Sequence, residues 1–398
     1  MNFKSFLIVA MIAGNVSANS YWENISNVVK EQPIYKNYLA TLNSSNALID
    51  IESARHFPKV TGSISRVDGS SSLNETSDAI QGSISMTYPL FDNNEQSSRD
   101  LIAISQGNIE NYQSAVELES QYIESADAYI DLWKAQEIKS ILKTSLNQIL
   151  KLIIKTRSAY DSGEASYLQL AKLEEEQMDI ENQILAIDYE AQSAQEIWQS
   201  DNQNLVFPNI DSMNKQLGPN AKFNLLLAEV ALSKAKVSLA SSEDGLSIDL
   251  SSSYLSREYK TGTDKEDVIW SLNATYPLFD GGLIDSKIAR EKLNEKAKTD
   301  ALANEKHRQS VKLKQFHLYI ENKSKYLTKK DKQCVKRDEL MQKSTERYEL
   351  GRGDVKEVLE SNLALNECRI ELIKSKVDIY QKYHRISQLN GTIRKFYK

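Results

Sequence analysis

The hydrophobic and polar positions of this chain alternate with a period of two in four short segments. The clearest examples are Ile80, Gly82, Ile84, Met86 and Tyr88, and then Val268, Trp270, Leu272, Ala274 and Tyr276. A period of two is typical of a β-strand with one apolar and one polar face. We therefore predict strands at about 58–67, 79–89, 246–256 and 267–277. Strands of about 9–11 residues cross a bilayer when tilted.

Beyond each strand pair, apolar residues recur every three or four positions. This spacing begins at Ile109, Tyr112 and Val116, and it continues beyond Gly163. It gives the apolar seam of a coiled coil. No proline lies between about 93 and 158, so one helix of roughly 100 Å can form at ~1.5 Å per residue. We predict helical hairpins at 93–200, with a turn near 160–166, and at 281–390, with a turn near 348–354.

The pentapeptide YPLFD occurs at 88–92 and again at 276–280, which is an offset of 276 − 88 = 188 positions. The same offset places Tyr160 on Tyr348 and Gly163 on Gly351. A constant offset between distant landmarks indicates a duplicated unit. We divide the chain into a first repeat at 19–207, a linker at 208–220 and a second repeat at 221–398.

The N-terminus has the layout of a targeting segment. Lys4 precedes an apolar run at 6–13, and small residues follow as far as Ala18. This order is typical of a secretory signal peptide, so we expect residues 1–18 to be removed; the alternative is a buried first helix. The residue directly after Ala18 is Asn19 and not a cysteine, so a lipid anchor there is not expected.

The composition excludes several classes of function. The net charge is −6 and the mean hydropathy is −0.49. This mild acidity argues against a nucleic-acid partner, because phosphates require a basic surface. No run of 18 apolar residues occurs beyond the N-terminus, so we expect no transmembrane helix.

Each YPLFD segment is interpreted as a junction between strand and helix. Pro89 and Pro277 lack an N–H and suit the end of a strand's pairing. Asp92 and Asp280 then stand where a helix N-cap is expected.

Four spanning strands cannot close a barrel, and an open edge in lipid leaves backbone groups unpaired. Closure needs at least eight strands, so the chain is expected to oligomerise. Tyr88, Trp270 and Tyr276 on the apolar face suit the aromatic girdle of a lipid interface. A half-buried sheet in a secreted soluble protein is the alternative for the alternation alone.

The chain resembles the TolC family of outer-membrane channels over nearly all of its mature length. The resemblance rests on TYPLFDNNEQSSRD, TYPLFDGGLIDSKIAREKL, the two Tyr-x-x-Gly turns and the duplicated strand-strand-helix-helix order. It implies a membrane β-barrel joined to a long α-helical coiled-coil barrel. It further implies a homotrimer with twelve strands, whose helices extend into the periplasm. The helical turns would meet a periplasmic adaptor of an inner-membrane pump or ABC transporter.

The resemblance also implies functional residues at those turns. Two acidic residues that ring the periplasmic entrance fall on Glu357 and Glu360, and the gate tyrosine falls on Tyr348. The family's basic gate residue falls on Gly353, next to Arg352, and the acidic position of the first repeat is Gln169. Solvated surface glutamates are the alternative for the acidic pair. The adaptor-contacting positions are Tyr160, Gly163, Tyr348 and Gly351.

Other chemistry-bearing residues give weaker signals. Cys334 and Cys368 are equidistant from residue 351, the centre of the second turn, so they either form a disulfide or serve as two small core residues. The four histidines have no metal-ligand spacing. No nucleophile elbow or phosphate loop is present. We expect neither an enzyme nor a cofactor or metal site.

These observations predict a passive outer-membrane exit duct of a tripartite export system. Its cargo is either small toxic compounds, as in efflux, or proteins, as in type I secretion. The rival hypothesis is a periplasmic coiled-coil adaptor or scaffold without a channel of its own.

Overall fold

The structure is a computed structural model that describes residues 18–67, 79–199, 216–259 and 265–397. The predicted signal peptide therefore lies outside the described residues, apart from Ala18, as does part of the predicted linker. In chain order the elements are α1 (Ala18–Glu31), α2 (Pro33–Ser53), η2 (Ala54–His56), β1 (Lys59–Val67), β2 (Ala79–Phe91), α3 (Glu95–Asp161), α4 (Tyr167–Trp198), α5 (Ala221–Ser242), β3 (Ser247–Tyr259), β4 (Lys265–Thr275), α6 (Leu283–Glu349), α7 (Val355–Leu389) and η4 (Ile393–Phe396).

The element boundaries repeat with the offset found in the sequence. Three pairs of elements begin 188 residues apart: α2 and α5 at 33 and 221, β1 and β3 at 59 and 247, and α4 and α7 at 167 and 355. The long helices α3 and α6 keep this offset at both their first and their last residues. The fold is thus two strand-strand-helix repeats, and both repeats have the same long helix. The sequence patterns did not predict α1, α2 or α5, although Ala47 and Ala235 already matched across the offset.

The chain divides into two compact units, each described here by itself. The first unit holds Met1–Lys36, Val116–Asn220 and His307–Lys398, and the second holds Asn37–Ala115 and Ala221–Lys306. The sheet belongs to the second unit. The helical turns at 162–166 and 350–354 belong to the first.

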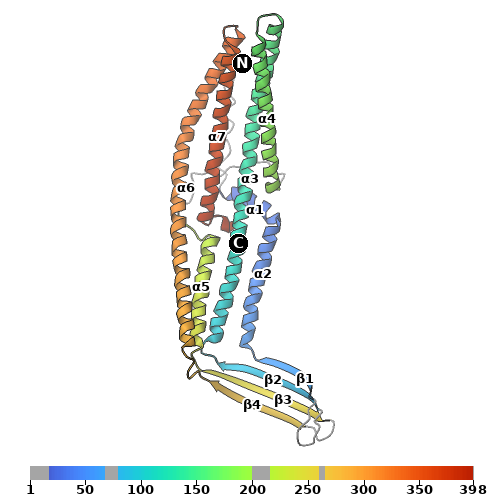
Figure 1. The fold of residues 1–398 in the computed structure, drawn as a ribbon, viewed down its shortest axis with the longest axis vertical. Helices are drawn as coiled ribbons and strands as arrows, with labels where there is room; N and C mark the ends of the chain where they lie inside the picture. Colours follow the sequence, from blue (N-terminus) through green and yellow to red (C-terminus); the bar gives the residue numbers. More distant parts are fainter. Residues whose placement is uncertain (1–17, 68–78, 200–215, 260–264, 398) are drawn as a thin grey trace. The chain divides into compact units, whose positions relative to one another are not determined.

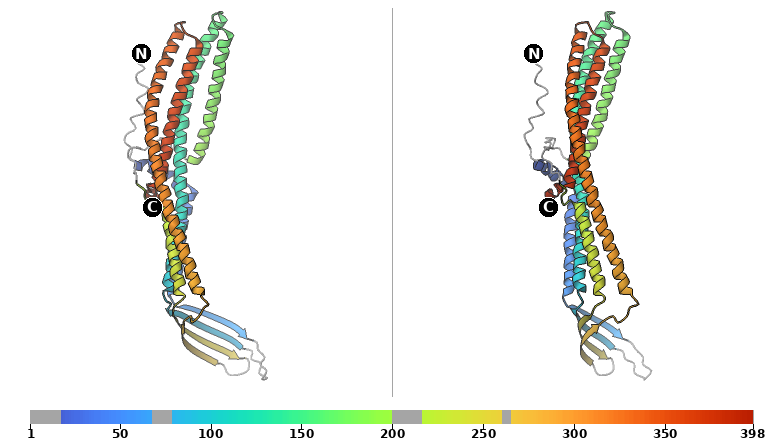
Figure 2. Two further views of the ribbon diagram at one scale, coloured as in Figure 1. Left: turned by 60° about the vertical axis from the view of Figure 1, so that its left-hand side comes forward. Right: turned by 90° about the vertical axis from the view of Figure 1, so that its left-hand side faces the viewer.

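The four strands form one antiparallel sheet in the order β1-β2-β3-β4 (Figures 1 and 2). The central pairing of β2 with β3 joins the strands of the two repeats, from Ala79 opposite Tyr259 to Phe91 opposite Ile248. β1 and β4 are the edges, and neither pairs on its outer side with any described part of the chain. Two rows of backbone N–H and C=O groups therefore remain open to another strand.

The register puts most of the apolar residues of the four strands on one face, with Leu255 and Ile269 among the exceptions on the other. Gly62, Ile84, Tyr254 and Val268 form one row across the sheet. The other face is mostly polar, and on it Thr61 bonds Ser85 and Ser63 bonds Ser83, each at 2.8 Å between hydroxyl oxygens. Ile64 is 85% exposed on the apolar face, so no described part of the chain covers it. Exposed apolar surface of this kind is typical of a contact with lipid or with another apolar surface.

The first YPLFD segment does not end its strand where the sequence pattern predicts. β2 continues to Phe91, and Pro89 lies opposite Asp249 inside the ladder, so the predicted end at residue 89 is wrong. The register shifts between Pro89 and Phe91, and such an irregularity tolerates a residue that lacks an N–H. In the second repeat, β4 ends at Thr275, before Pro277.

In the second unit, small residues bring the helices close together. The backbone oxygen of Ser45 on α2 lies 3.2 Å from where a Cβ on Gly107 of α3 would stand. The Ser45 hydroxyl donates to Asn111 at 2.8 Å, and the hydroxyls of Ser98 and Ser238 lie 2.8 Å apart, which joins α3 to α5. Ser45 and Ser98 are buried, and because their hydroxyls are paired they carry no desolvation penalty for an unmade bond.

In the first unit, α7 contacts α6 and α3, and α4 contacts both α3 and α7. Arg369 on α7 pairs with Asp338 on α6 at 3.0 Å. The hydroxyl of Ser145 on α3 donates to Asn362 on α7 at 2.7 Å. Lys134 on α3 pairs with Glu190 on α4 at 3.2 Å. Apolar side chains of α3, α4 and α7, including Ile149, Leu173 and Val358, form the core between these helices.

An aromatic cluster fixes α1 to the same unit. The side chains of Tyr21, Trp22, Tyr129, Tyr383 and His384 all lie in ring contact with Tyr21 or Trp22. The Tyr21 hydroxyl lies 2.6 Å from Nε2 of the buried His384, whose Nδ1 lies 2.7 Å from an Asp127 oxygen. Burial lowers the pKa of His384 even though Asp127 and Asp131 favour its charged form, while Arg385 opposes it.

This lowered pKa predicts a pH-dependent stability. Because the unfolded chain binds a proton more readily at His384 than the folded chain does, the stability from this site is complete above the unfolded pKa of about 6.5 and is lost as pH falls below it. We expect the melting temperature, followed by circular dichroism, to fall between pH 7.5 and 5.5, and to fall less in His384→Gln. His56→Gln, at an exposed histidine of the second unit, is the control. An equal fall in His384→Gln and the wild type would contradict the assignment.

Candidate functional site at the helical turns

The two helical turns have the same backbone geometry. Gly163 and Gly351 both adopt positive φ, at 80° and 72°. The Gly163 N–H donates to the carbonyl of Tyr160 at 2.9 Å, and the Gly351 N–H donates to that of Tyr348 at 3.0 Å. Glycine is favoured because a Cβ is strained in this region. The predicted Tyr-x-x-Gly positions therefore form the turns themselves, at the end of each long helix.

Each return helix begins with a different cap. Ser166 and Gln169 form a capping box on α4, in which the Gln169 Oε1 accepts from the Ser166 N–H at 3.1 Å. Asp354 caps α7 and accepts from the Lys356 N–H at 3.1 Å. Gln169 matches Glu357 across the offset of 188, so its amide caps a helix where the second repeat has a carboxylate that pairs with Arg347.

Glu357 and Glu360 both lie on the first two turns of α7 and both pair with a cation. The Glu357 carboxylate accepts from Arg347 Nη1 at 3.1 Å, and the Glu360 carboxylate lies 3.7 Å from Lys356 Nζ. Their side chains are 46% and 67% exposed, so solvent screens both pairs. Their spacing of three residues places the carboxylates on one side of α7.

Tyr348 connects the second hairpin to the first. Its hydroxyl lies 2.8 Å from Oγ1 of the buried Thr156 on α3, and Lys155 Nζ lies 5.0 Å from the centre of its ring. Lys155 also donates to the Glu349 carbonyl at 3.3 Å. These contacts join the two turns by a hydrogen bond and a cation–π contact.

The basic partner of Glu357 is Arg347, which the sequence did not predict. Arg352, the predicted gate residue, is exposed and forms no ion pair among the described residues. A Cβ at Gly353 would come within 3.0 Å of the Tyr348 nitrogen and 3.2 Å of the Arg347 carbonyl carbon, so a longer side chain there needs a backbone shift. The only sequence signal for Arg347 was its place in the last turn of α6.

The strand-to-helix junctions also repeat. The Asp92 carboxylate accepts from the Gln96 N–H at 2.8 Å, and the Asp280 carboxylate accepts from the Ile284 N–H at 2.7 Å. Each aspartate therefore satisfies an amide of the first helical turn. The two residues that follow have positive φ in both repeats, at Asn93, Asn94, Gly281 and Gly282. Asparagine tolerates this conformation better than most residues, which explains the exchange.

Cys334 on α6 and Cys368 on α7 form a disulfide in the structure, with their Cα atoms 5.6 Å apart. Both residues are buried. The bond joins the two helices of the second hairpin. The first hairpin has Leu146 and Ile180 at the matching positions.

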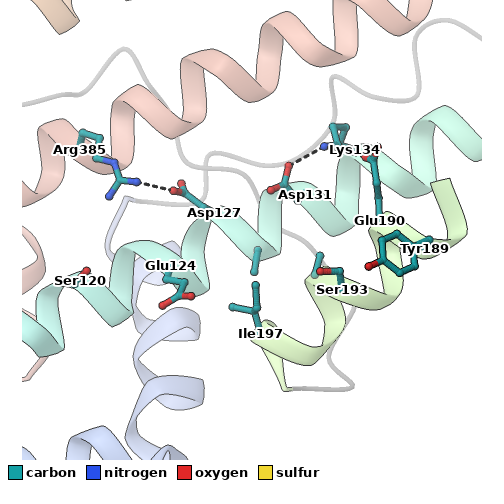
Figure 3. A pocket seen from close by; sticks show the side chains of 12 residues that line it. Ser120, Glu124, Asp127, Asp131, Lys134, Tyr189, Glu190, Ser193, Ile197 and Arg385 are labelled. Atoms are coloured by element: carbon teal, nitrogen blue, oxygen red, sulfur yellow. Dashed lines mark hydrogen bonds and ion pairs between the residues drawn. The ribbon is translucent and has the colours of Figure 1, made fainter. Parts of the chain in front are cut away.

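A groove of about 590 Å³ lies between α3 and α4 (Figure 3). Its charges are largely matched: Asp127 pairs with Arg385, and Lys134 pairs with both Asp131 and Glu190. Within the described ranges no group of three or more histidine, cysteine or acidic residues could hold a metal ion.

No helix in the described part of the chain is both long enough and apolar enough to cross a membrane.

Comparison with known proteins identifies relatives by sequence and by fold. Residues 25–197 match the family model described as outer membrane efflux protein. No curated protein matches the chain in sequence. The fold is similar to the outer membrane protein VceC from Vibrio cholerae, with a TM-score of 0.80, 12% identity and coverage of 94% of this chain and 96% of that one. It is also similar to the CmeC outer membrane channel of Campylobacter jejuni, with a TM-score of 0.79, 13% identity and coverage of 96% and 89%. The open MtrE outer membrane channel of Neisseria gonorrhoeae gives a TM-score of 0.77, 13% identity and coverage of 93% and 89%.

The disulfide predicts a simple mass measurement. The denatured intact chain should gain two hydrogens on reduction, and iodoacetamide should label Cys334 and Cys368 only after reduction, because a disulfide has no thiol to alkylate. Labelling of both residues in the unreduced, denatured chain would show that they are only core residues.

Proposed function

We propose that this chain, which belongs to the outer membrane efflux protein family, forms a homotrimer that passively conducts cargo from a periplasmic pump assembly to the exterior. The family consists of outer-membrane channels of tripartite export systems, so the chain is not an enzyme. The rival hypothesis of an adaptor without a channel is set aside for the same reason. The efflux family favours small compounds over proteins as cargo.

The open sheet is the observation that carries the proposal. A four-stranded sheet with an uncovered apolar face and two unpaired edges is costly in water and in lipid. Three copies placed edge to edge give twelve strands, turn the apolar face toward lipid and leave the serine-rich face toward a watery lumen.

The helical turns are the proposed contact with the periplasmic partner. Tyr160, Tyr167 and Leu168 of the first turn and Leu350 of the second are exposed apolar residues at the ends of the hairpins. A periplasmic adaptor of an inner-membrane pump or ABC transporter would bind this end. The Thr156–Tyr348 hydrogen bond would hold the two hairpins of one chain together in the closed entrance, and the Arg347–Glu357 pair would hold α6 to α7 within the second hairpin.

Glu357 and Glu360 are the proposed acidic ring of the entrance. Three chains would bring six carboxylates toward the pore axis, and such rings attract cations. Arg347 and Lys356 offset part of this charge within each chain, so the ring would be a moderate cation filter.

Single-channel recording in planar bilayers tests the proposal. The purified protein should migrate as a heat-sensitive trimer and should conduct ions. Glu357→Gln with Glu360→Gln should keep the trimer and the conductance but lower the preference for K⁺ over Cl⁻, measured as the reversal potential in a salt gradient. Glu346→Gln, at an exposed position on α6, is the control. A monomer without conductance would contradict the proposed channel. An unchanged reversal potential in the double variant would contradict only the proposed acidic ring.

A further inference from the structure

The helices at the two edges of the four-helix layer in the first unit carry opposite charge. α4 has eight acidic residues and one basic residue. The part of α6 that lies in this unit, from His307 to Glu349, has twelve lysines and arginines against six acidic residues. α6 contacts α7, and α4 contacts α3 and α7, so the two helices lie on opposite sides of this unit (Figure 1). On the side away from these contacts, neither helix has a neighbour among the described residues.

The outward face of α4 carries an exposed heptad stripe, defined here as the α4 stripe. Its members are Glu175, Met178, Asn182, Leu185 and Tyr189. Met178, Leu185 and Tyr189 are 57%, 67% and 74% exposed, which is unusual for apolar side chains at such regular spacing. Beside them, burial raises the pKa of Glu176, and repulsion from Asp179 and Glu175 adds to this rise.

The outward face of α6 carries a matching stripe, defined here as the α6 stripe. Its members are Lys329, Gln333, Lys336, Leu340 and Lys343, and all five are exposed. Leu340 is 54% exposed. Its spacing of three and four residues is the same as that of the α4 stripe, but its charged members are all cations.

Contacts inside the chain show which residues of the two hairpins lie at the same height along the helices. We count each position as its number of residues from the glycine of its turn, Gly163 in the first hairpin and Gly351 in the second. Thr156 is at 163 − 156 = 7 in the first hairpin, and it meets Tyr348, at 351 − 348 = 3 in the second. Gln148 is at 163 − 148 = 15, and it accepts from Asn362, at 362 − 351 = 11. Both contacts give a difference of four, so residue n of α4 is level with residue 518 − n of α6.

This relation pairs the two stripes member by member. Glu175 is level with Lys343, Met178 with Leu340, and Tyr189 with Lys329. In a ring closed by rotation about an axis along the helices, neighbouring copies meet at equal levels. An acidic side chain then faces a lysine, an apolar one faces an apolar one, and a tyrosine ring faces a lysine.

We propose that the α4 stripe of one copy packs antiparallel against the α6 stripe of a second copy of this chain, and that this charge-matched seam aligns the helical parts of the trimer. The inference rests on the proposed trimer and adds its contact residues. The seam buries the exposed apolar side chains of Met178, Leu185, Tyr189 and Leu340, and it places lysines beside an acidic cluster that repels itself.

A charge swap tests the seam in the full-length protein in detergent. Lys343→Glu and Glu175→Lys should each raise the protein concentration at half-dissociation of the trimer, about tenfold or more, because each removes a pair and creates a like-charge contact at all three seams. The double variant should return to within a few-fold of the wild type, since it restores opposite charges. Native mass spectrometry over a dilution series gives the trimer fraction.

Matched control variants use the interior helix α3, which has a neighbour on each side. Lys151→Glu and Glu137→Lys reverse exposed charges of the same kind there, and they should leave the trimer as stable as the wild type. Equal dissociation of the two seam variants and the wild type would overturn the seam while leaving the channel proposal standing. Failure of the double variant to recover would also overturn it. A wild type that is never trimeric would instead overturn the proposed function.

Discussion

The backbone groups on the open edges of β1 and β4 impose the constraint on which the rest of the structure depends. Each unpaired N–H or C=O group costs roughly several kcal/mol in hydrocarbon. The four-stranded sheet of a single chain therefore cannot enter a membrane with its two edges unpaired. The antiparallel order β1-β2-β3-β4 leaves one open edge from each repeat, and these two edges can pair with each other only in another copy. The proposed oligomer follows from this strand count.

Because of the duplication, each repeat contributes two strands to the sheet and one long helix with a return helix. The constant offset between the repeats fixes the ends of α3 and α6, the starts of the return helices and the positive-φ residues at turns and junctions. Where the repeats differ, the differences are local and chemical: Gln169 caps a helix while Glu357 carries charge, and Asn93 and Asn94 take the conformation of Gly281 and Gly282. The two repeats thus share one backbone plan, and the proposed acidic ring belongs to the second turn alone.

Periodicity and offset predicted the strands, the long hairpins and both turn glycines, because these depend on local pattern. They did not predict α2 and α5, whose small residues and buried serines pack closely without a strong apolar stripe. Arg347 as partner of Glu357 was also missed, since ten residues of sequence and a turn separate them. The end of β2 depended on an irregularity at Pro89 that only the pairing with β3 reveals. Local chemistry was readable from the sequence, whereas contacts between elements were not.

The most direct test of the central claim is a cysteine cross-link between the two open edges. Ser63→Cys on β1 is combined in turn with Ile269→Cys, Ser271→Cys or Asn273→Cys on β4, all on the polar face. The native cysteines are already bonded to each other, so they should not interfere. The account predicts that at least one pair gives covalent species of two and three chains, and no larger, on non-reducing denaturing gels. Monomer alone in every combination would contradict closure of the barrel by β1 and β4.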